Sequence, residues 1–426
     1  MNAQVSTAAE FAGMRRQGVY YGWWVLGVAF SGEMLAVGST NYGYGLFVKP
    51  LTAEFGIDRA LANSGLMLFI VGMGVAAAPV GRLLDRYPAR VVIALGALLM
   101  GAGMAGIALS HSLLGMALFL LLPVSLGAAA IGPLGANTMA ARWFERRRGV
   151  ALGIVAIGTS VGGTLMVPLI GFEIQRYGWR SALLIQAALI AGVIGGLAWC
   201  VVRSRPQDLG LQPGAAPAPG LSAPSDEEVW TARRALRHRD FWCINVAVAL
   251  TLAILQSMLV SLVPYATDRG FGLAQAQWMV SCMAACSIAG KLSFGAMSDR
   301  FDKRWLLLVA IGAVMVEQLT LLLAPGYRTL LLIGGMAGFA SGAVLPVWAS
   351  LIAERFGARS FSSVMGLMNV LNVSAIGIAI PFIGAVYDST GNYALAFQLF
   401  LCVALAAAFA SVLITPLPRP DLRSRS

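Results

Sequence analysis

Apolar stretches of about 20 residues follow one another along nearly the whole chain, separated by short polar or charged segments. A helix of that length crosses the roughly 30 Å of hydrocarbon in a bilayer. A backbone in lipid must satisfy its own hydrogen bonds, so helices are the spanning structure that such runs favour. The pattern predicts an all-α membrane protein with twelve transmembrane helices, at residues 20–48, 61–80, 91–109, 113–140, 149–172, 181–202, 241–265, 274–297, 305–324, 330–353, 361–385 and 393–416.

An internal repeat divides the twelve helices into two groups of six. Because six is even, both groups enter and leave the membrane on the same side, which predicts two parallel six-helix pseudo-repeats. We expect an N-terminal bundle at 1–202, a Pro-, Gly- and Ala-rich cytoplasmic linker at 203–239 and a C-terminal bundle at 240–426. The residues that recur at one constant separation include Pro133 and Pro346, Arg142 and Arg355, Gly153 and Gly366, Pro168 and Pro381, and Gly171 and Gly384.

Composition agrees with this interpretation, because 58% of the residues are hydrophobic and only 12% are charged. A net charge of +11 would suggest a nucleic-acid partner in a soluble protein. Here the Lys and Arg residues concentrate in the loops on the side of the N-terminus, and no nucleic-acid partner is expected. By the positive-inside rule both termini are cytoplasmic, in a multi-pass protein of the cytoplasmic (inner) membrane. We expect a monomer surrounded by lipid.

The sequence gives little support for a catalytic site or a cofactor site. Its five cysteines lie in or beside apolar segments without the spacing of a metal site, and no phosphate-binding loop for ATP is present. The stretch Gly158-Thr159-Ser160-Val161-Gly162 matches the nucleophile elbow of hydrolases. However, no strand precedes it, and no histidine lies within a span to act as a base. We therefore expect no catalysis, no metal and no cofactor.

Two short charged loops repeat each other, one after the second predicted helix and one after the eighth. Glycine lets helix ends pack closely, and the charged side chains can form ion pairs in one conformation and break them in another. This predicts a gating role; the alternative is that these charges only set the topology. The gating candidates are Gly81, Asp85, Arg86 and Arg90 in the first loop and Gly295, Asp299, Arg300 and Arg304 in the second.

These loops resemble the signature loop of the major facilitator superfamily, although Pro88 stands where a glycine is usual. The resemblance implies a secondary transporter with a substrate cavity between two bundles. Further stretches resemble the bacterial monocarboxylate transporters and the oxalate:formate antiporter group: Tyr21-Gly22-Trp23-Trp24, Trp143-Phe144-x-x-Arg147-Arg148-Gly149-x-Ala151-x-Gly153, Tyr177-Gly178-Trp179-Arg180, Arg205-Pro206-x-x-Leu209-Gly210-Leu211 and Asp388-x-x-Gly391.

Lys291 is a cation inside the eighth predicted helix. A charge in hydrocarbon costs at least about 2.5 kcal/mol, so Lys291 is expected to face a wet cavity and a partner. In the monocarboxylate transporters that this chain resembles, the matching position is an arginine, which is implied to bind the substrate carboxylate. Lysine loses its proton more readily than arginine and lacks the bidentate fork. The alternative is a lysine that snorkels to the interface.

The candidates for proton coupling are Glu33 in the first helix and Lys291 itself, whereas Glu317 in the ninth helix is better explained as a structural residue. The resemblance implies an aspartate one turn before the cation, but Ser287 stands there. Glu33 lies in mid-span, and the alternative is a protonated packing carboxyl. The resemblance also implies a second cation in the eleventh helix for oxalate transport, and residues 361–385 contain none. Candidate cavity residues, each also explicable by packing, are Tyr42, Asn41, Asn137, Tyr265, Trp348 and Asn369.

The sequence therefore predicts a secondary active transporter of a small monocarboxylate that works by alternating access with proton symport. Exchange or efflux of another organic solute is the alternative within transport. A transporter-like protein that senses a solute is an alternative from another class.

Overall fold

The computed structural model describes residues 20–144, 148–204, 232–298, 300–324 and 326–415. All regular elements in these ranges are helices. Eleven of them are long and apolar enough to cross a membrane. A further span, at the start of the described chain, is divided into three shorter pieces. The prediction of an all-α membrane fold with twelve spans is confirmed.

The first half of the chain forms six spans. They consist of α2 (Gly22–Val37), η1 (Gly38–Tyr42) and α3 (Tyr44–Phe55); α4 (Arg59–Arg86); α5 (Ala89–Leu109); α6 (Leu113–Phe119), η2 (Leu120–Val124), α7 (Ser125–Ile131) and α8 (Pro133–Trp143); α9 (Arg148–Tyr177); and α10 (Trp179–Leu189), η3 (Ile190–Ile194) and α11 (Gly195–Val201).

The second half begins with a short helix, α12 (Ala232–Arg237), which lies in the predicted linker. Residues 205–231 of that linker are outside the described residues. The helix α16 (Tyr327–Thr390) contains two spans, Tyr327–Gly357 and Val364–Thr390, because Gly357 has a φ of 73° and interrupts the helical backbone. The other spans are α13 (Arg239–Asp268), α14 (Leu273–Met297), α15 (Lys303–Leu322) and α17 (Ala394–Val412).

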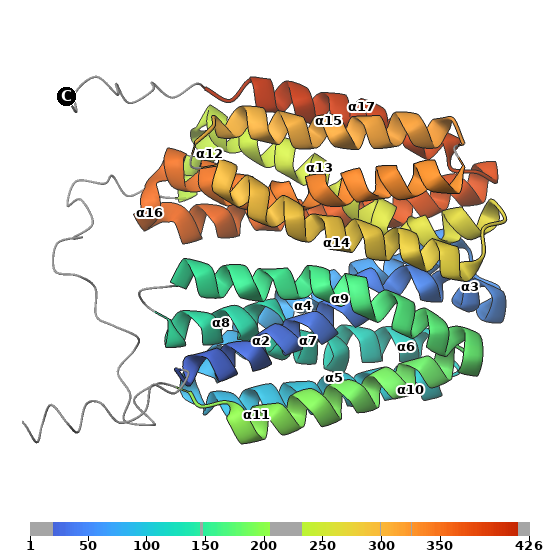
Figure 1. The fold of residues 1–426 in the computed structure, drawn as a ribbon, viewed down its shortest axis with the longest axis vertical. Coiled ribbons are helices and arrows are strands. Elements are labelled where there is room, and N and C mark those ends of the chain that lie inside the picture. The colour runs from blue at the N-terminus through green and yellow to red at the C-terminus, as the bar shows by residue number, and fades with distance from the viewer. Residues whose placement is uncertain (1–19, 145–147, 205–231, 299, 325, 416–426) are drawn as a thin grey trace, which may run out of the picture.

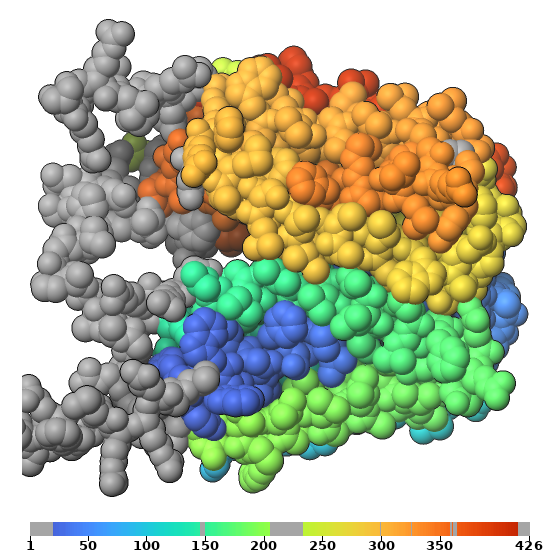
Figure 2. Space-filling model, in the orientation of Figure 1, coloured from blue at the N-terminus to red at the C-terminus, as the bar shows by residue number. Residues whose placement is uncertain are grey.

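The two halves lie side by side, with their helices roughly parallel to a common axis (Figure 1). In the space-filling view they form two masses of similar size, blue to green and yellow to red (Figure 2). The halves meet where α9 packs against α14 and where α4 packs against α16. We call the face on which α4, α8 and α14 end the Arg142 face, and the face on which α3, α9 and α13 end the Asp268 face.

Three spans of the first half contain a five-residue π turn, namely η1, η2 and η3. A π turn inserts an extra residue into a helix and often marks a functional position. The turn η1 carries two of the predicted cavity residues, Asn41 and Tyr42, and leads into α3 through Gly43. The sequence did not predict these turns, because the apolar pattern continues through them.

Candidate functional site between the two halves

The helices α9 and α14 run in opposite directions and pack against each other across the boundary between the halves. Near the Asp268 face, the space beside Gly171 of α9 is filled by the Gln277 side chain of α14. Further along, Gly163 leaves room for Ala284 of α14 and for the ring of Tyr42, whose atoms a Cβ would approach to 2.5–2.7 Å. Contacts between the two halves therefore continue in a line along α9 and α14.

Two buried serines continue this line. The hydroxyl oxygens of Ser160 on α9 and Ser287 on α14 lie 2.7 Å apart. Ser287 donates its own proton to the Ala284 carbonyl oxygen over 2.8 Å, so Ser160 is the donor in the serine pair. The Tyr42 hydroxyl lies beside both serines. Hydroxyl groups from three helical segments thus meet at this point.

Lys291 makes the next contact along the line. Its ammonium group donates to the Ala156 carbonyl oxygen at 2.7 Å, the Thr159 hydroxyl at 2.5 Å and the Ser160 hydroxyl at 2.8 Å. All three acceptors belong to α9 of the other half, and together they use the three donors of an ammonium group. Hydrogen bonds to charged groups contribute about 1.5–3 kcal/mol each. Lys291 therefore fastens the second half to the first.

Beyond Lys291 the two helices separate. A Cβ added at Gly153, one turn from Ala156 on α9, would have nothing within 4 Å. The same is true of Gly295, one turn from Lys291 on α14. Lys291 therefore stands where the contact between α9 and α14 ends and the separation toward the Arg142 face begins.

The pairing of α4 with α16 follows the same plan. Near the Asp268 face, a Cβ at Gly384 would come within 2.7 Å of the Ala60 backbone nitrogen. Met67 lies beside Gly377 two turns further along α4. Nothing lies within 4 Å of a Cβ at Gly74. The halves are thus in contact toward the Asp268 face and apart toward the Arg142 face.

An ionic cluster closes the Asp268 face. Asp268 at the end of α13 pairs with Lys49 of α3 and with Arg59 of α4, both at 2.6 Å. The Arg59 guanidinium also lies 3.6 Å from the centre of the Tyr387 ring. Asp388 accepts hydrogen bonds from the backbone nitrogens of Arg59 and Ala60, at 3.1 and 2.9 Å. A carboxylate of the second half thereby caps the first turn of α4, where it meets the positive end of the helix dipole.

Glu33 of α2 is 2% exposed, and its Oε2 atom has no hydrogen-bond partner among the described residues. It packs against α9 at Gly158, where an added Cβ would lie 3.4 Å from the Glu33 Cβ. Gly158 belongs to the same stretch of α9 that accepts the hydrogen bonds of Lys291. Glu33 and Lys291 therefore interact electrostatically, but they do not form an ion pair. This arrangement leaves a buried carboxyl group near a cation that is bound elsewhere.

The other predicted cavity residues lie in different surroundings. Asn41 is half-buried in η1, whereas Asn137 on α8 and Asn369 on α16 are exposed. Tyr265 is buried near the Asp268 face, where its hydroxyl accepts a hydrogen bond from Arg269. Trp348 is buried within the second half and its Nε1 lies 3.5 Å from the Met368 sulfur. Among the predicted cavity residues, the structure brings Tyr42 beside the serines of the Lys291 contact, places Tyr265 near the Asp268 face and buries Trp348 within the second half.

In the first charged loop, Asp85 accepts a 2.8 Å hydrogen bond from the Arg142 guanidinium of α8. Arg90 lies over the Trp199 ring, with its guanidinium carbon 5.4 Å from the centre. Arg86 is exposed, and Gly81 has open space beside it. The loop therefore ties α4 to α8 within one half.

In the second charged loop, the predicted residue Asp299 lies outside the described residues. Arg300 is exposed. Asp302 caps α15 by accepting from the Arg304 backbone nitrogen, and it also pairs with the Arg304 guanidinium at 2.6 Å. These hydrogen bonds from Arg304 hold the pKa of the Asp302 carboxyl below its usual range.

Sequence reasoning missed several of these residues. In the sequence, Thr159 and Ser160 stand out only as part of a pattern that resembles a nucleophile elbow, whereas in the structure they accept hydrogen bonds from Lys291. The signal in the sequence is the adjacent pair of hydroxyl side chains between Gly158 and Gly162, inside a predicted span. Glu173 is buried and accepts hydrogen bonds from Gln186, which in turn accepts one from Ser39 of η1. Glu173 lies one residue beyond the predicted end of the fifth span, so the prediction does not include it in the membrane.

The described residues contain no group of three or more His, Cys, Asp or Glu side chains that could hold a metal ion. The site offers one ammonium group, several hydroxyls and a buried carboxyl. This set can bind an anion and can hold or release a proton.

Comparisons with known proteins agree with this architecture. The family model of the Major Facilitator Superfamily matches residues 19–274 and 249–426. Monocarboxylate transporter 11 of Mus musculus is 27% identical over 407 residues, which cover 91% of this chain and 86% of the relative. Monocarboxylate transporter 12 of Rattus norvegicus is 27% identical over 308 residues, and the match spans only 61% of that relative's length.

A solved structure with a similar fold is that of a bacterial homolog of the human lysosomal transporter Spinster, in an inward-facing and unoccupied conformation. The TM-score is 0.68 at 17% sequence identity, and the superposition covers 93% of this chain and 95% of that one. At this identity the likeness shows the fold alone.

Proposed function

Because the chain belongs to the Major Facilitator Superfamily and is a transport protein, we propose that it moves a small monocarboxylate across the cytoplasmic membrane by alternating access. The proposal includes symport with a proton. The relatives named as monocarboxylate transporters support the substrate class. The single observation that carries the proposal is the position of Lys291, at the point where the contact between the halves ends.

The mechanism follows from the cost of enclosing a charge. In this conformation Lys291 borders the separated region and donates to three acceptors on α9. When the Arg142 face closes, the ammonium group becomes enclosed between the halves. Burying an unneutralised charge is expensive, whereas a carboxylate hydrogen-bonded to the ammonium group reduces that penalty. A bound carboxylate therefore favours the closed arrangement, and a ligand shifts an equilibrium only through such a difference in affinity.

Proton coupling is assigned to Glu33. Its Oε2 atom is buried without a partner, and an uncompensated carboxylate in that place is costly. Protonation of Glu33 removes the cost of burying its charge while Lys291 donates its hydrogen bonds to α9. After the substrate is released, the Lys291 ammonium group and the Glu33 carboxyl group still lie against the same stretch of α9. The Arg142 face is the cytoplasmic face in this proposal, because the positive-inside rule places it there.

The test is uptake into proteoliposomes of lactate, pyruvate, short fatty acids, aromatic acids, oxalate and neutral sugars, with and without an inward proton gradient. We expect uptake of one or more monocarboxylates, faster with the gradient, and no uptake of sugars. In Lys291→Ala the uptake should fall about tenfold or more, as expected for a lost charge-assisted contact of at least 1.4 kcal/mol.

The matched control is Lys303→Ala, which removes a lysine that pairs with Glu354 at 3.4 Å outside the contact between the halves. Uptake of sugars without carboxylates, or equal carboxylate uptake by both lysine variants, contradicts the proposal. Uptake that ignores the proton gradient contradicts only its symport component and favours exchange.

A further inference from the structure

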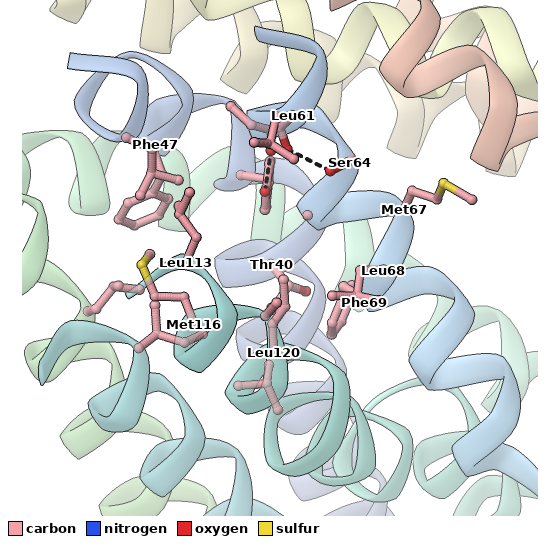
Figure 3. Close-up of a pocket in the computed structure, with 18 of the residues that line it drawn as sticks. Thr40, Phe47, Leu61, Ser64, Met67, Leu68, Phe69, Leu113, Met116 and Leu120 are labelled. Carbon is pink, nitrogen blue, oxygen red and sulfur yellow. Dashed lines mark hydrogen bonds between the residues drawn. The ribbon is translucent and has the colours of Figure 1, made fainter. Parts of the chain in front are cut away.

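The first half contains a cavity of about 440 Å³ that is separate from the Lys291 contact. Its walls come from the first, second, fourth and sixth spans, with a small contribution from the third (Figure 3). Cavities of this size are typical of ligand sites. None of its lining residues carries a charge. A carboxylate would find no cationic partner in these walls, so the cavity suits an uncharged ligand.

The hydroxyl groups in the walls already have partners. Thr40 donates to the Ala36 carbonyl oxygen at 2.6 Å, and Tyr44 donates to the Ala62 carbonyl oxygen at 2.7 Å. Ser64 donates to the Leu61 carbonyl oxygen at 2.6 Å, a bond drawn in Figure 3. The remaining surface consists of leucine, methionine, phenylalanine and other apolar side chains. Apolar cavities of this kind do not hold water, so the walls favour a hydrocarbon ligand.

The cavity opens sideways between α4 and α6. Leu61 is 52% exposed and Val71 37% exposed on α4, and Leu113 is 37% exposed on α6. Figure 3 shows side chains of α4 on one side of the cavity and those of the α6 and η2 segment on another. These surfaces belong to candidate membrane spans, so we take the medium at the opening to be the hydrocarbon of the bilayer.

The depth of the cavity also fits a lipid chain. Its α4 wall runs from Leu61 to Val71, which begins at the Asp268 face. At about 1.5 Å per residue this wall is about 15 Å long. That is roughly half of the 30 Å hydrocarbon thickness, which corresponds to one leaflet.

We propose that this cavity is a binding site for one acyl chain of a phospholipid, which enters from the leaflet at the Asp268 face between α4 and α6. The phospholipid is the source because the opening faces the side of the bundle. Two walls of the site, α3 and the start of α4, also carry Lys49 and Arg59 of the ionic cluster. A bound chain therefore supports the helix ends that close the Asp268 face.

The test uses the full-length protein in liposomes that contain a phosphatidylcholine with a photoactivatable group on one acyl chain. After illumination, adducts are mapped by peptide mass spectrometry. We expect adducts concentrated at residues 61–71 and 113–120. Filling the cavity by Ala117→Trp should reduce them about tenfold, equivalent to 1.4 kcal/mol of lost binding free energy.

The matched control is Ala406→Trp, which adds the same side chain at an exposed position of α17 and should leave these adducts unchanged. Ala117→Leu fills part of the cavity with a smaller side chain, and it replaces Ala117→Trp if the latter does not elute as a single species. Adducts spread evenly over the lipid-exposed helices overturn the proposal. So do equal yields in the Ala117 and Ala406 variants, and so does labelling by a photoactivatable free fatty acid but not by the phospholipid.

Discussion

At the scale of single residues, the Lys291 contact explains how a cation is held in a membrane-spanning segment. The three acceptors on α9 replace the water that the ammonium group would otherwise require. They are a carbonyl and two hydroxyls, not carboxylates, so they bind the cation without neutralising it. Lys291 thus keeps a charge that an anion can still neutralise.

Removing one acceptor should weaken the contact only when the cation is present. We expect Ser160→Ala to lower the apparent melting temperature of the detergent-solubilised protein, because it removes a hydrogen bond to a charged donor of about 1.5–3 kcal/mol. In a Lys291→Met background the same substitution should have a much smaller effect, since the contacting pair is no longer intact. Equal shifts in both backgrounds would show that Ser160 acts through Ser287 and not through Lys291.

A second residue-scale prediction concerns Asp302, whose pKa is lowered by the hydrogen bonds from Arg304. A lowered folded-state pKa gives stability that is present above the unfolded value of about 3.9. That stability is lost as the pH falls through the lower, folded-state pKa. The Asp302 side chain is 41% exposed, so after solvent screening we expect about 0.5 kcal/mol.

Asp302→Asn, which keeps a capping side chain, should therefore lower the melting temperature slightly at pH 7 and have less effect as the pH falls below about 4. In an Arg304→Gln background the effect of Asp302→Asn on the melting temperature should nearly disappear. An effect that persists in that background at pH 7 would assign it to the helix cap instead of the ion pair.

At the scale of elements, the sequence predicted the spans well because their apolar runs are long and their ends are charged. The boundaries were less accurate. The first span was expected to end at Val48, but α3 continues through Pro50 to Phe55. The backbone break at Gly357 fell in the expected loop between the tenth and eleventh spans. The π turns were missed, because they change the hydrogen bonding of the backbone without changing the apolar pattern.

The candidate site was only partly predictable for a related reason. Lys291 was identified because a charge in an apolar run is visible in one sequence. Its partners Thr159 and Ser160 are common in spans, and their importance depends on the pairing of α9 with α14. Arg59 and Asp268 are charges at helix ends, where such residues are ordinary. Only the packing of the halves shows that these two meet.

The pairing of α4 with α16 makes an element-scale prediction about Gly384. A side chain at this position meets rigid backbone at Ala60, and overpacking of this kind typically costs about 1–3 kcal/mol. Gly384→Ala should therefore open the Asp268 face. Gly312→Ala on α15 is the control, because an added Cβ there has nothing within 4 Å and the position lies outside the contacts between the halves.

The measurement is the distance between spin labels at Ala53→Cys and Asn392→Cys, two exposed positions on opposite halves near the Asp268 face. The exposed native cysteines Cys200 and Cys402 are replaced first. A longer distance is expected in Gly384→Ala and an unchanged one in Gly312→Ala. If the two variants give the same distance, Gly384 is not a contact that limits closure.

At the scale of the whole molecule, the internal repeat relates the two boundaries between the halves. Gly171 on α9 and Gly384 on α16 recur at the separation of the repeat, and both lie against the opposite half near the Asp268 face. Gly153 and Gly366 are related in the same way, and both have open space near the Arg142 face. The molecule therefore has two pairs of repeat-related glycines at the boundaries between the halves. One pair contacts the opposite half in this conformation, and the other pair does not.

This duplication argues that Gly153 and Gly366 become the contacts when the Arg142 face closes. A bulky side chain at Gly153 has room in the present conformation but would then meet α14 near Gly295. We expect Gly153→Leu to leave the melting temperature nearly unchanged and to reduce the uptake rate about 5- to 150-fold, the range that an overpacking cost of about 1–3 kcal/mol gives. Spin labels at Val150→Cys and Leu292→Cys, two exposed positions of α9 and α14, should report a loss of the shorter distances.

Gly312→Leu on α15, another glycine with nothing within 4 Å of an added Cβ, is the control outside both boundaries. Wild-type uptake in Gly153→Leu, with the short distances retained, would mean that the Arg142 face closes without bringing Gly153 against α14.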